Sequence, residues 1–138
     1  MITAVDTSVL IDILTPDPRF GPASASALSA CLADGDVVAC EVVWAESAAR
    51  FPSADQVGPT FRRVGLRYLP LGDEAASMAG HAWGMYRRGG GPRERIAPDF
   101  LIGAHAAIHA DRLLTRDRGF YRRYFAELEI VDPASVHG

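Results

Sequence analysis

Short apolar runs alternate along the chain with longer stretches in which apolar residues recur at helical spacing. The apolar runs, at 1–5, 37–40, 67–71, 112–115 and 129–131, predict strands. The stretches at 9–14, 23–32, 41–51, 55–64, 73–87, 98–110 and 119–125 predict helices. Alternation of this kind favours an α/β fold, with a parallel sheet of four to five strands and helices on both faces. No linker divides the chain, so we expect one domain over 1–138.

Two of the predicted strands end on a small hydroxyl residue and an aspartate. The first runs into Asp6, Thr7 and Ser8, and the run Leu113-Leu114-Thr115-Arg116 leads to Asp117. Ligands of open α/β sheets bind in the crevice outside the carboxyl ends of the strands. We therefore expect both aspartates to face that crevice.

Two further carboxylates lie on predicted helices among apolar neighbours. Glu46 belongs to the segment Trp44-Ala45-Glu46, and Asp99 follows Pro98 at the start of a helix rich in Gly and Ala. Each acid taken alone has a simpler explanation, because Asp6, Asp99 and Asp117 suit helix capping and Glu46 suits a solvated helix surface. Four together would crowd negative charge into one crevice, which predicts a bound cation. Oxygen ligands favour Mg²⁺, with Mn²⁺ as the other candidate.

Composition excludes several other classes of protein. The longest apolar stretches are interrupted by Gly, Asp or Arg, so we expect no membrane span and a cytoplasmic protein. Cys31 and Cys40 lack the spacing of a zinc site and are expected to be buried thiols. His105 and His109 lack the HExxH pattern of a zinc site, so we do not expect them to bind zinc. All fourteen basic residues are Arg, and the absence of Lys disfavours an aspartyl phosphotransfer enzyme.

The motifs together resemble those of PIN-domain nucleases, specifically the VapC-type toxins of bacterial toxin-antitoxin pairs. The resemblance rests on Val5-Asp6-Thr7-Ser8-Val9-Leu10-Ile11-Asp12, Trp44-Ala45-Glu46, the segment from Pro98 to Ala106, and Leu114-Thr115-Arg116-Asp117-Arg118-Gly119-Phe120. It covers nearly the whole chain. It implies a metal-dependent endoribonuclease in which hydrolysis of RNA phosphodiester bonds depends on Asp6, Glu46, Asp99 and Asp117.

Within that resemblance, Asp6, Asp99 and Asp117 would bind the Mg²⁺. Glu41 lies near Glu46 on the same predicted helix, and we prefer Glu46 for its Trp-Ala-Glu context. The family also suggests that Thr115 and Ser8 orient a metal-bound water or a carboxylate. Bonds to nearby backbone groups are an equally good explanation for both hydroxyls.

RNA capture by a chain of net charge −3 would depend on local arginines. Arg93 and Arg95 follow the glycine run at 89–91, and Arg116 and Arg118 flank Asp117. A solvated basic face or a contact with an acidic partner would explain them equally well.

The resemblance implies a homodimer or a toxin-antitoxin hetero-oligomer, in which a cognate antitoxin covers the acidic crevice. Trp44, Phe51, Phe61 and Trp83 would form a groove for it, or belong to the core. The alternative function is a PIN-like module that binds RNA or protein without turnover.

Overall fold

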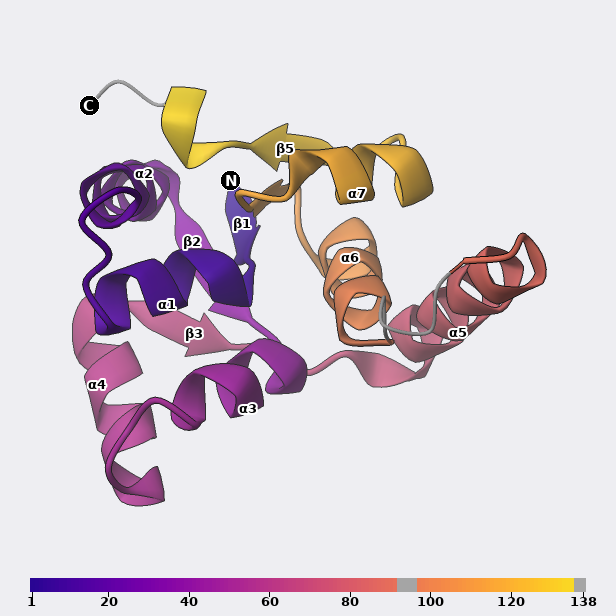
Figure 1. The fold of residues 1–138 in the computed structure, drawn as a ribbon. Helices are drawn as coiled ribbons and strands as arrows, with labels where there is room; N and C mark the ends of the chain where they lie inside the picture. Colours follow the sequence, from indigo (N-terminus) through magenta and orange to yellow (C-terminus); the bar gives the residue numbers. More distant parts are fainter. Residues whose placement is uncertain (92–96, 136–138) are drawn as a thin grey trace.

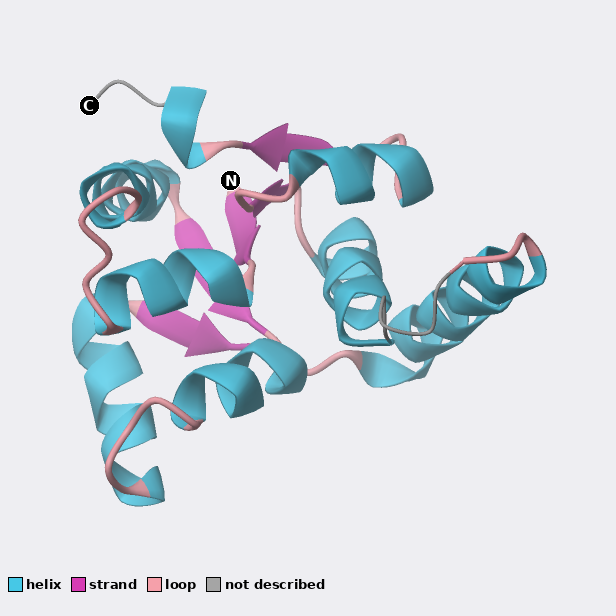
Figure 2. Cartoon of the chain, viewed as in Figure 1, coloured by secondary structure: helices cyan, strands magenta, loops and turns pink. Residues whose placement is uncertain are grey.

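The protein folds around a five-stranded parallel sheet (Figures 1 and 2). The computed structural model describes residues 1–91 and 97–135. Its strands are β1 (Ile2–Val5), β2 (Asp36–Ala39), β3 (Leu66–Tyr68), β4 (Arg112–Leu114) and β5 (Glu129–Val131). They lie side by side in the order β3-β2-β1-β4-β5. The predicted fold class is therefore confirmed.

Helices connect each strand to the next. They are α1 (Thr7–Leu14), α2 (Gly21–Asp34), α3 (Glu41–Ala48), α4 (Val57–Val64), α5 (Gly72–Arg88), α6 (Ala97–His109) and α7 (Arg118–Tyr124), with short 3₁₀ turns at Ala54–Gln56 and Pro133–Ser135. Figure 1 shows α2 and α4 on one side of the sheet and α5 and α6 on the other. Right-handed crossovers produce this division, because the connections before β3 and after β3 run in opposite directions across the sheet.

Most predicted boundaries differ from the structure by one or two residues, and two differ by three. The third helix ends at Ala48 rather than at residue 51, because Arg50 and Phe51 donate to carbonyls only three residues back and Pro52 follows. The third strand spans 66–68 rather than 67–71. Leu69 still donates its N–H to the carbonyl of Ala39, but Pro70 has no N–H with which to continue the pairing.

Strand β1 occupies the centre of the sheet, between β2 and β4. Its last three residues are buried, as expected for a parallel strand covered on both faces. Along the chain, β2 and then β3 are added on one side of β1, and β4 and then β5 are added on the other side of β1. The strand order reverses between β1 and β4, and open α/β sheets bind ligands at such a reversal.

Helix α6 packs closely against the C-terminal end of α7. A Cβ atom built on Gly103 would lie 2.3 Å from the ring of Phe125, so only glycine fits there. Ala104 and Ala106 are also fully buried, and α6 contacts both β1 and β4. The small side chains thus hold the first turn of α6 near the strand ends.

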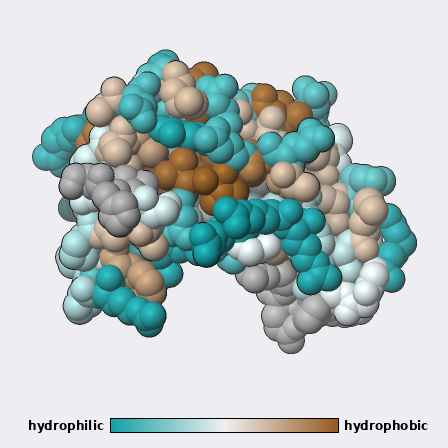
Figure 3. All heavy atoms as spheres, turned by 90° about the horizontal axis from the view of Figure 1, so that it is seen from above, coloured by the Kyte–Doolittle hydropathy of each residue, from teal (hydrophilic) through white to brown (hydrophobic). Residues whose placement is uncertain are grey.

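The surface is largely polar outside a few apolar positions. In the view from above, polar residues occupy most of the face and apolar residues gather near its middle (Figure 3). Cys31 and Cys40 are buried free thiols, as predicted. Among the described helices, none combines the length and the apolar character needed to cross a membrane.

Candidate active site

Asp6 is the innermost of the four predicted acids. It follows β1 directly, and its backbone N–H extends the pairing with β4 by donating to the carbonyl of Leu114 at 2.9 Å. The side chain is only 6% exposed. Thr115 Oγ1 donates to Asp6 Oδ2 at 2.7 Å, and the Tyr121 hydroxyl donates to the same oxygen at 3.4 Å. The carboxyl group at the end of the central strand is thus held in place by Thr115, which directly follows β4, and by Tyr121 of α7.

Thr115 connects Asp6 to the second strand-end aspartate. Its hydroxyl donates to Asp6 and accepts the backbone N–H of Asp117 at 2.9 Å. One buried oxygen therefore fixes both the orientation of the Asp6 carboxyl and the path of the chain at Asp117. The geometry explains why a hydroxyl residue precedes this aspartate in the sequence.

The charges of Asp99 and Asp117 act on Asp6. Asp99 lies in the first turn of α6, and both side chains are half-buried. The pKa of Asp6 is raised from 3.8 to about 6. Burial is the main cause, and the charges of Asp99 and Asp117 also raise the pKa, whereas the hydrogen bond from Thr115 lowers it. The structure thus brings three predicted acids into electrostatic contact.

Glu46, an exposed residue of α3, is linked to the segment around Asp6 through Thr7 of α1. The Thr7 hydroxyl donates to Glu46 Oε1 at 2.7 Å, and Thr7 follows Asp6 directly. Glu41, the alternative on the same helix, instead accepts the backbone N–H of Leu71 at 2.8 Å. The contact therefore links Glu46, and not Glu41, to the segment that carries Asp6.

Ser8 is the second supporting hydroxyl expected from the sequence. Its Oγ atom is buried and makes no hydrogen bond with the described residues. Buried hydroxyls ordinarily find a partner, so an orphaned one beside an acidic crevice fits a site completed by a further group.

The donor set suits a hard divalent cation in its chemistry. Carboxylates and hydroxyls supply the oxygen ligands that Mg²⁺ and Mn²⁺ prefer, and a cation would offset the repulsion that raises the pKa of Asp6. Within 1–91 and 97–135, however, no three Asp, Glu, His or Cys side chains converge closely enough to hold an ion. The side chains would have to draw together for a metal to bind.

Arg116 has a structural partner that the sequence analysis did not anticipate. Its Nε and Nη2 atoms lie 2.6 and 3.0 Å from the two carboxylate oxygens of Asp12, which is 3% exposed. Ser24 also donates to Asp12 at 2.8 Å, and the guanidinium lies 4.0 Å from the centre of the Phe20 ring. An aspartate inside the apolar run Val9-Leu10-Ile11-Asp12-Ile13-Leu14 was the available signal, because a buried carboxylate requires a partner.

The remaining arginines predicted to bind RNA differ in position. Arg118 is exposed at the start of α7 and lies 3.6 Å from Asp132. Arg93 and Arg95 lie outside the described residues.

Two further groups near the sheet have structural partners. Nε2 of His105 lies 2.8 Å from the carbonyl of Leu69, and Nε2 of His109 contacts the carbonyl of Leu71. Burial lowers the pKa of His105, which favours the neutral ring. These contacts fix α6 against the segment after β3.

Thr7 and Tyr121 are the residues of the candidate site that the sequence analysis did not single out, although Thr7 lies within the first acidic motif.

Comparison with known proteins agrees with this arrangement. The family model described as "PIN domain" matches residues 3–126. The chain belongs to the PIN domain family. This PIN domain has no significant match among curated proteins.

Solved structures share the PIN fold over nearly the whole chain. VapBC2 from Rickettsia felis bound to a promoter DNA fragment has a TM-score of 0.70 at 17% identity, covering 96% of this chain and 98% of that one. VapBC-1 from nontypeable Haemophilus influenzae also has a TM-score of 0.70, at 16% identity over 98% and 100%. FitAcB from Neisseria gonorrhoeae has a TM-score of 0.68, at 22% identity over 99% and 100%. At these identities the likeness establishes the fold.

Proposed function

We propose that this PIN domain is a metal-dependent endoribonuclease, the toxin of a VapC-type toxin-antitoxin pair. The observation that carries the proposal is the buried Asp6 carboxyl at the strand-order reversal, with the charges of Asp99 and Asp117 acting on it. Mutual repulsion in a buried position lowers stability, so such a cluster is retained where the carboxylates bind a cation. Mg²⁺ is the preferred ion, with Mn²⁺ as the alternative.

The residues of the site have distinct roles in this proposal. Asp6, Asp99 and Asp117 would hold the metal, and Glu46 would complete the site directly or through water. Thr115 keeps the Asp6 carboxyl and the Asp117 backbone in place, and Thr7 orients Glu46. Ser8 offers a free hydroxyl to a water or to the metal. When bound, the metal supplies activation of water and neutralisation of the charge that grows on the phosphate.

A cognate antitoxin is the expected protein partner. The similar solved structures include a "Toxin-antitoxin complex from Klebsiella pneumoniae", which matches at 20% identity and a TM-score of 0.68. We propose that an antitoxin covers the acidic crevice of this chain, and that the toxin acts on RNA in the cytoplasm as a homodimer or hetero-oligomer. Of the aromatic residues considered for an antitoxin groove, Phe61 is buried, whereas Trp44, Phe51 and Trp83 are half-buried.

Cleavage of RNA by the purified protein tests the proposal. We expect cleavage of single-stranded RNA with Mg²⁺, none with excess chelator, and a loss of at least about 100-fold in Asp6→Asn and Asp99→Asn. Asp73→Asn is the matched control, because Asp73 occupies the first turn of α5 as Asp99 occupies that of α6, and it is exposed. Cleavage at the parental rate by Asp6→Asn would refute the assignment.

The alternative is a binding module without turnover. The absence of a converged metal cluster among the described side chains is the observation that favours it. Such a module would bind RNA or a protein partner equally well with chelator and would cut nothing under any metal.

A further inference from the structure

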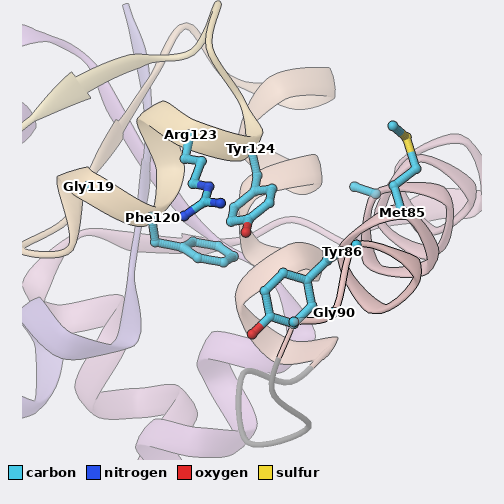
Figure 4. A pocket seen from close by; sticks show the side chains of 10 residues that line it. Met85, Tyr86, Gly90, Gly119, Phe120, Arg123 and Tyr124 are labelled. Atoms are coloured by element: carbon cyan, nitrogen blue, oxygen red, sulfur yellow. The ribbon is translucent and has the colours of Figure 1, made fainter.

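A cavity lies between the C-terminal half of α5 and helix α7 (Figure 4). Its volume is about 740 Å³, within the range of pockets that hold small organic ligands. Its lining residues are Ala82, Met85, Tyr86, Gly89, Gly90, Gly91, Gly119, Phe120, Arg123 and Tyr124. A Cβ built on Gly90 or Gly119 would meet nothing within 4 Å, so these glycines border open space.

Aromatic rings form much of the cavity wall. In Figure 4, the side chains of Phe120, Arg123 and Tyr124 extend from α7 toward the ring of Tyr86 on α5. The ring centres of Tyr86 and Tyr124 lie 5.5 Å apart, and those of Phe120 and Tyr124 lie 5.0 Å apart. Flat aromatic groups of a ligand bind well to such a wall, because stacking does not require a particular hydrogen-bond pattern.

The same rings connect the cavity to the acidic site. Phe100, which follows Asp99 in the chain, lies 5.5, 5.1 and 5.3 Å from the ring centres of Tyr86, Phe120 and Tyr124. On the other wall, Gly119 lies two residues after Asp117. A polymer whose phosphate approached the acids would therefore have its adjoining unit near this cavity.

Both walls carry positive charge in a chain whose net charge is −3. Arg87 and Arg88 end α5, and Arg122 and Arg123 end α7. Residues 75–91 and 118–126 contain no Asp or Glu. The Arg123 guanidinium lies 5.4 Å from the centre of the Tyr124 ring, so a cation borders the aromatic wall. This pairing of rings with arginines complements a ligand that alternates flat bases and phosphates.

We infer that the cavity binds an unpaired base of the RNA strand next to the phosphate held at the acidic site. The base stacks against the aromatic wall at Tyr124, and Arg123 binds a neighbouring backbone phosphate. This inference rests on the proposed function, which it deepens by naming where one base of the single-stranded substrate binds. Bases within a duplex are stacked on one another and are unavailable to the rings.

Binding of a fluorescent single-stranded RNA to catalytically disabled Asp6→Asn protein tests the inference without cleavage. Added to that protein, Tyr124→Leu should weaken binding roughly ten-fold or more, whereas Tyr124→Phe, which retains a ring, should bind within about two-fold of the parent. Tyr68→Leu is the matched control, because Tyr68 is an exposed tyrosine of β3 at the far edge of the sheet. Thermal unfolding of each variant verifies its fold.

A second pair of variants keeps the test valid should Tyr124→Leu disturb folding. Arg122 and Arg123 are both exposed on α7, but only Arg123 lines the cavity. Arg123→Gln should weaken binding at least three-fold more than Arg122→Gln, although both remove one charge. Equal effects would indicate a general electrostatic attraction and would overturn the inference.

An RNA with one abasic position identifies what occupies the cavity. In parental Asp6→Asn protein, removal of the stacked base should weaken binding by about the same factor as Tyr124→Leu, and in Tyr124→Leu the same removal should have little effect. Additive losses, or unchanged RNA binding by Tyr124→Leu with loss of binding to a protein partner, would overturn the inference.

RNA cleavage by the wild-type chain is measured separately. Cleavage that is unaffected by Tyr124→Leu contradicts only the base-binding role of the cavity, whereas Tyr124-dependent binding without cleavage contradicts only the proposed nuclease activity.

Discussion

Asp6 is a carboxyl group that the fold makes harder to ionise. Its pKa of about 6 exceeds the ordinary value of 3.8, mainly because the group is buried and also because Asp99 and Asp117 are near. The folded protein therefore holds this proton more tightly than the unfolded chain does. The stability that Asp6 contributes is fully present below pH 3.8 and is lost as the pH rises through 6.

Replacement of the ionisable group should remove this loss. At pH 8, without metal, we expect Asp6→Asn to raise the free energy of unfolding by up to about 3 kcal/mol, the equivalent of the pKa difference. At pH 4 the two proteins should be nearly equal, because the native carboxyl is then mostly protonated. Urea denaturation with chelator at both pH values measures the difference. Asp73→Asn should show no such dependence, and a less stable Asp6→Asn protein at pH 8 would contradict the prediction.

The sequence alone predicted that Asp6, Asp99 and Asp117 lie near one another, because it places them at recognisable starts and ends of elements. Asp6 and Asp117 follow apolar strand runs, and Asp99 follows a helix-starting proline. Thr7 and Tyr121 were not singled out, since their roles depend on contacts with residues 39 and 115 positions away. A hydroxyl near an aspartate is common, and only the folded arrangement shows which carboxylate receives its hydrogen bond.

Helix α1 and the turn between β4 and α7 are joined by the Asp12–Arg116 pair. Arg116 lies between Thr115 and Asp117, so the pair fixes the turn that supplies both residues to the acidic site. The Asp12 side chain is 4% exposed and that of Arg116 is 32% exposed. Removal of the arginine would leave a buried negative charge without its partner.

We expect Arg116→Gln to lower the free energy of unfolding by about 3 kcal/mol. Arg118→Gln, two residues later, is the matched control and should cost less than about 1 kcal/mol, because Arg118 is exposed and lies 3.6 Å from Asp132. Addition of Asp12→Asn to Arg116→Gln should recover part of the loss, since the unpaired charge is then gone. Urea denaturation at pH 7 measures all three, and equal losses for the two single arginine variants would contradict the structural role of the Asp12–Arg116 pair.

The elements themselves were largely predictable, and the exceptions have local causes. The strand at 66–68 lies at an edge of the sheet and ends early, because Pro70 cannot donate a hydrogen bond. The helix beginning at Glu41 ends before Pro52. Neither boundary affects the acidic site, whose strands β1 and β4 have clear apolar patterns.

The whole molecule combines a negative net charge with a concentration of acids at the carboxyl ends of strands β1 and β4. Binding of a divalent cation there would relieve repulsion only in the folded state, and a ligand that binds only the folded state raises stability. The effect does not depend on RNA, so it provides a test of the metal site that is separate from activity.

Mg²⁺ or Mn²⁺ should therefore raise the melting temperature of the wild-type protein at pH 8. A metal concentration of about 100 times Kd raises the free energy of unfolding by about 2.7 kcal/mol. This corresponds to a rise in melting temperature of roughly 5–10 °C for a domain of this size. Asp6→Asn and Asp99→Asn should lose most of this shift, and Asp73→Asn should retain it. Differential scanning fluorimetry with a metal titration makes the measurement. An equal shift in Asp6→Asn would place the cation elsewhere.

The Thr115–Asp6 hydrogen bond spans 109 residues of sequence, and it constrains when a nascent chain can assemble the candidate site. On a ribosome, β1 emerges well before its neighbour β4 and the residues that orient Asp6. Until then β1 lacks one of its two partner strands and remains an open sheet edge. A translation product interrupted before β4 therefore contains Asp6 but not the candidate site, and the activity proposed for that site requires synthesis at least through Asp117.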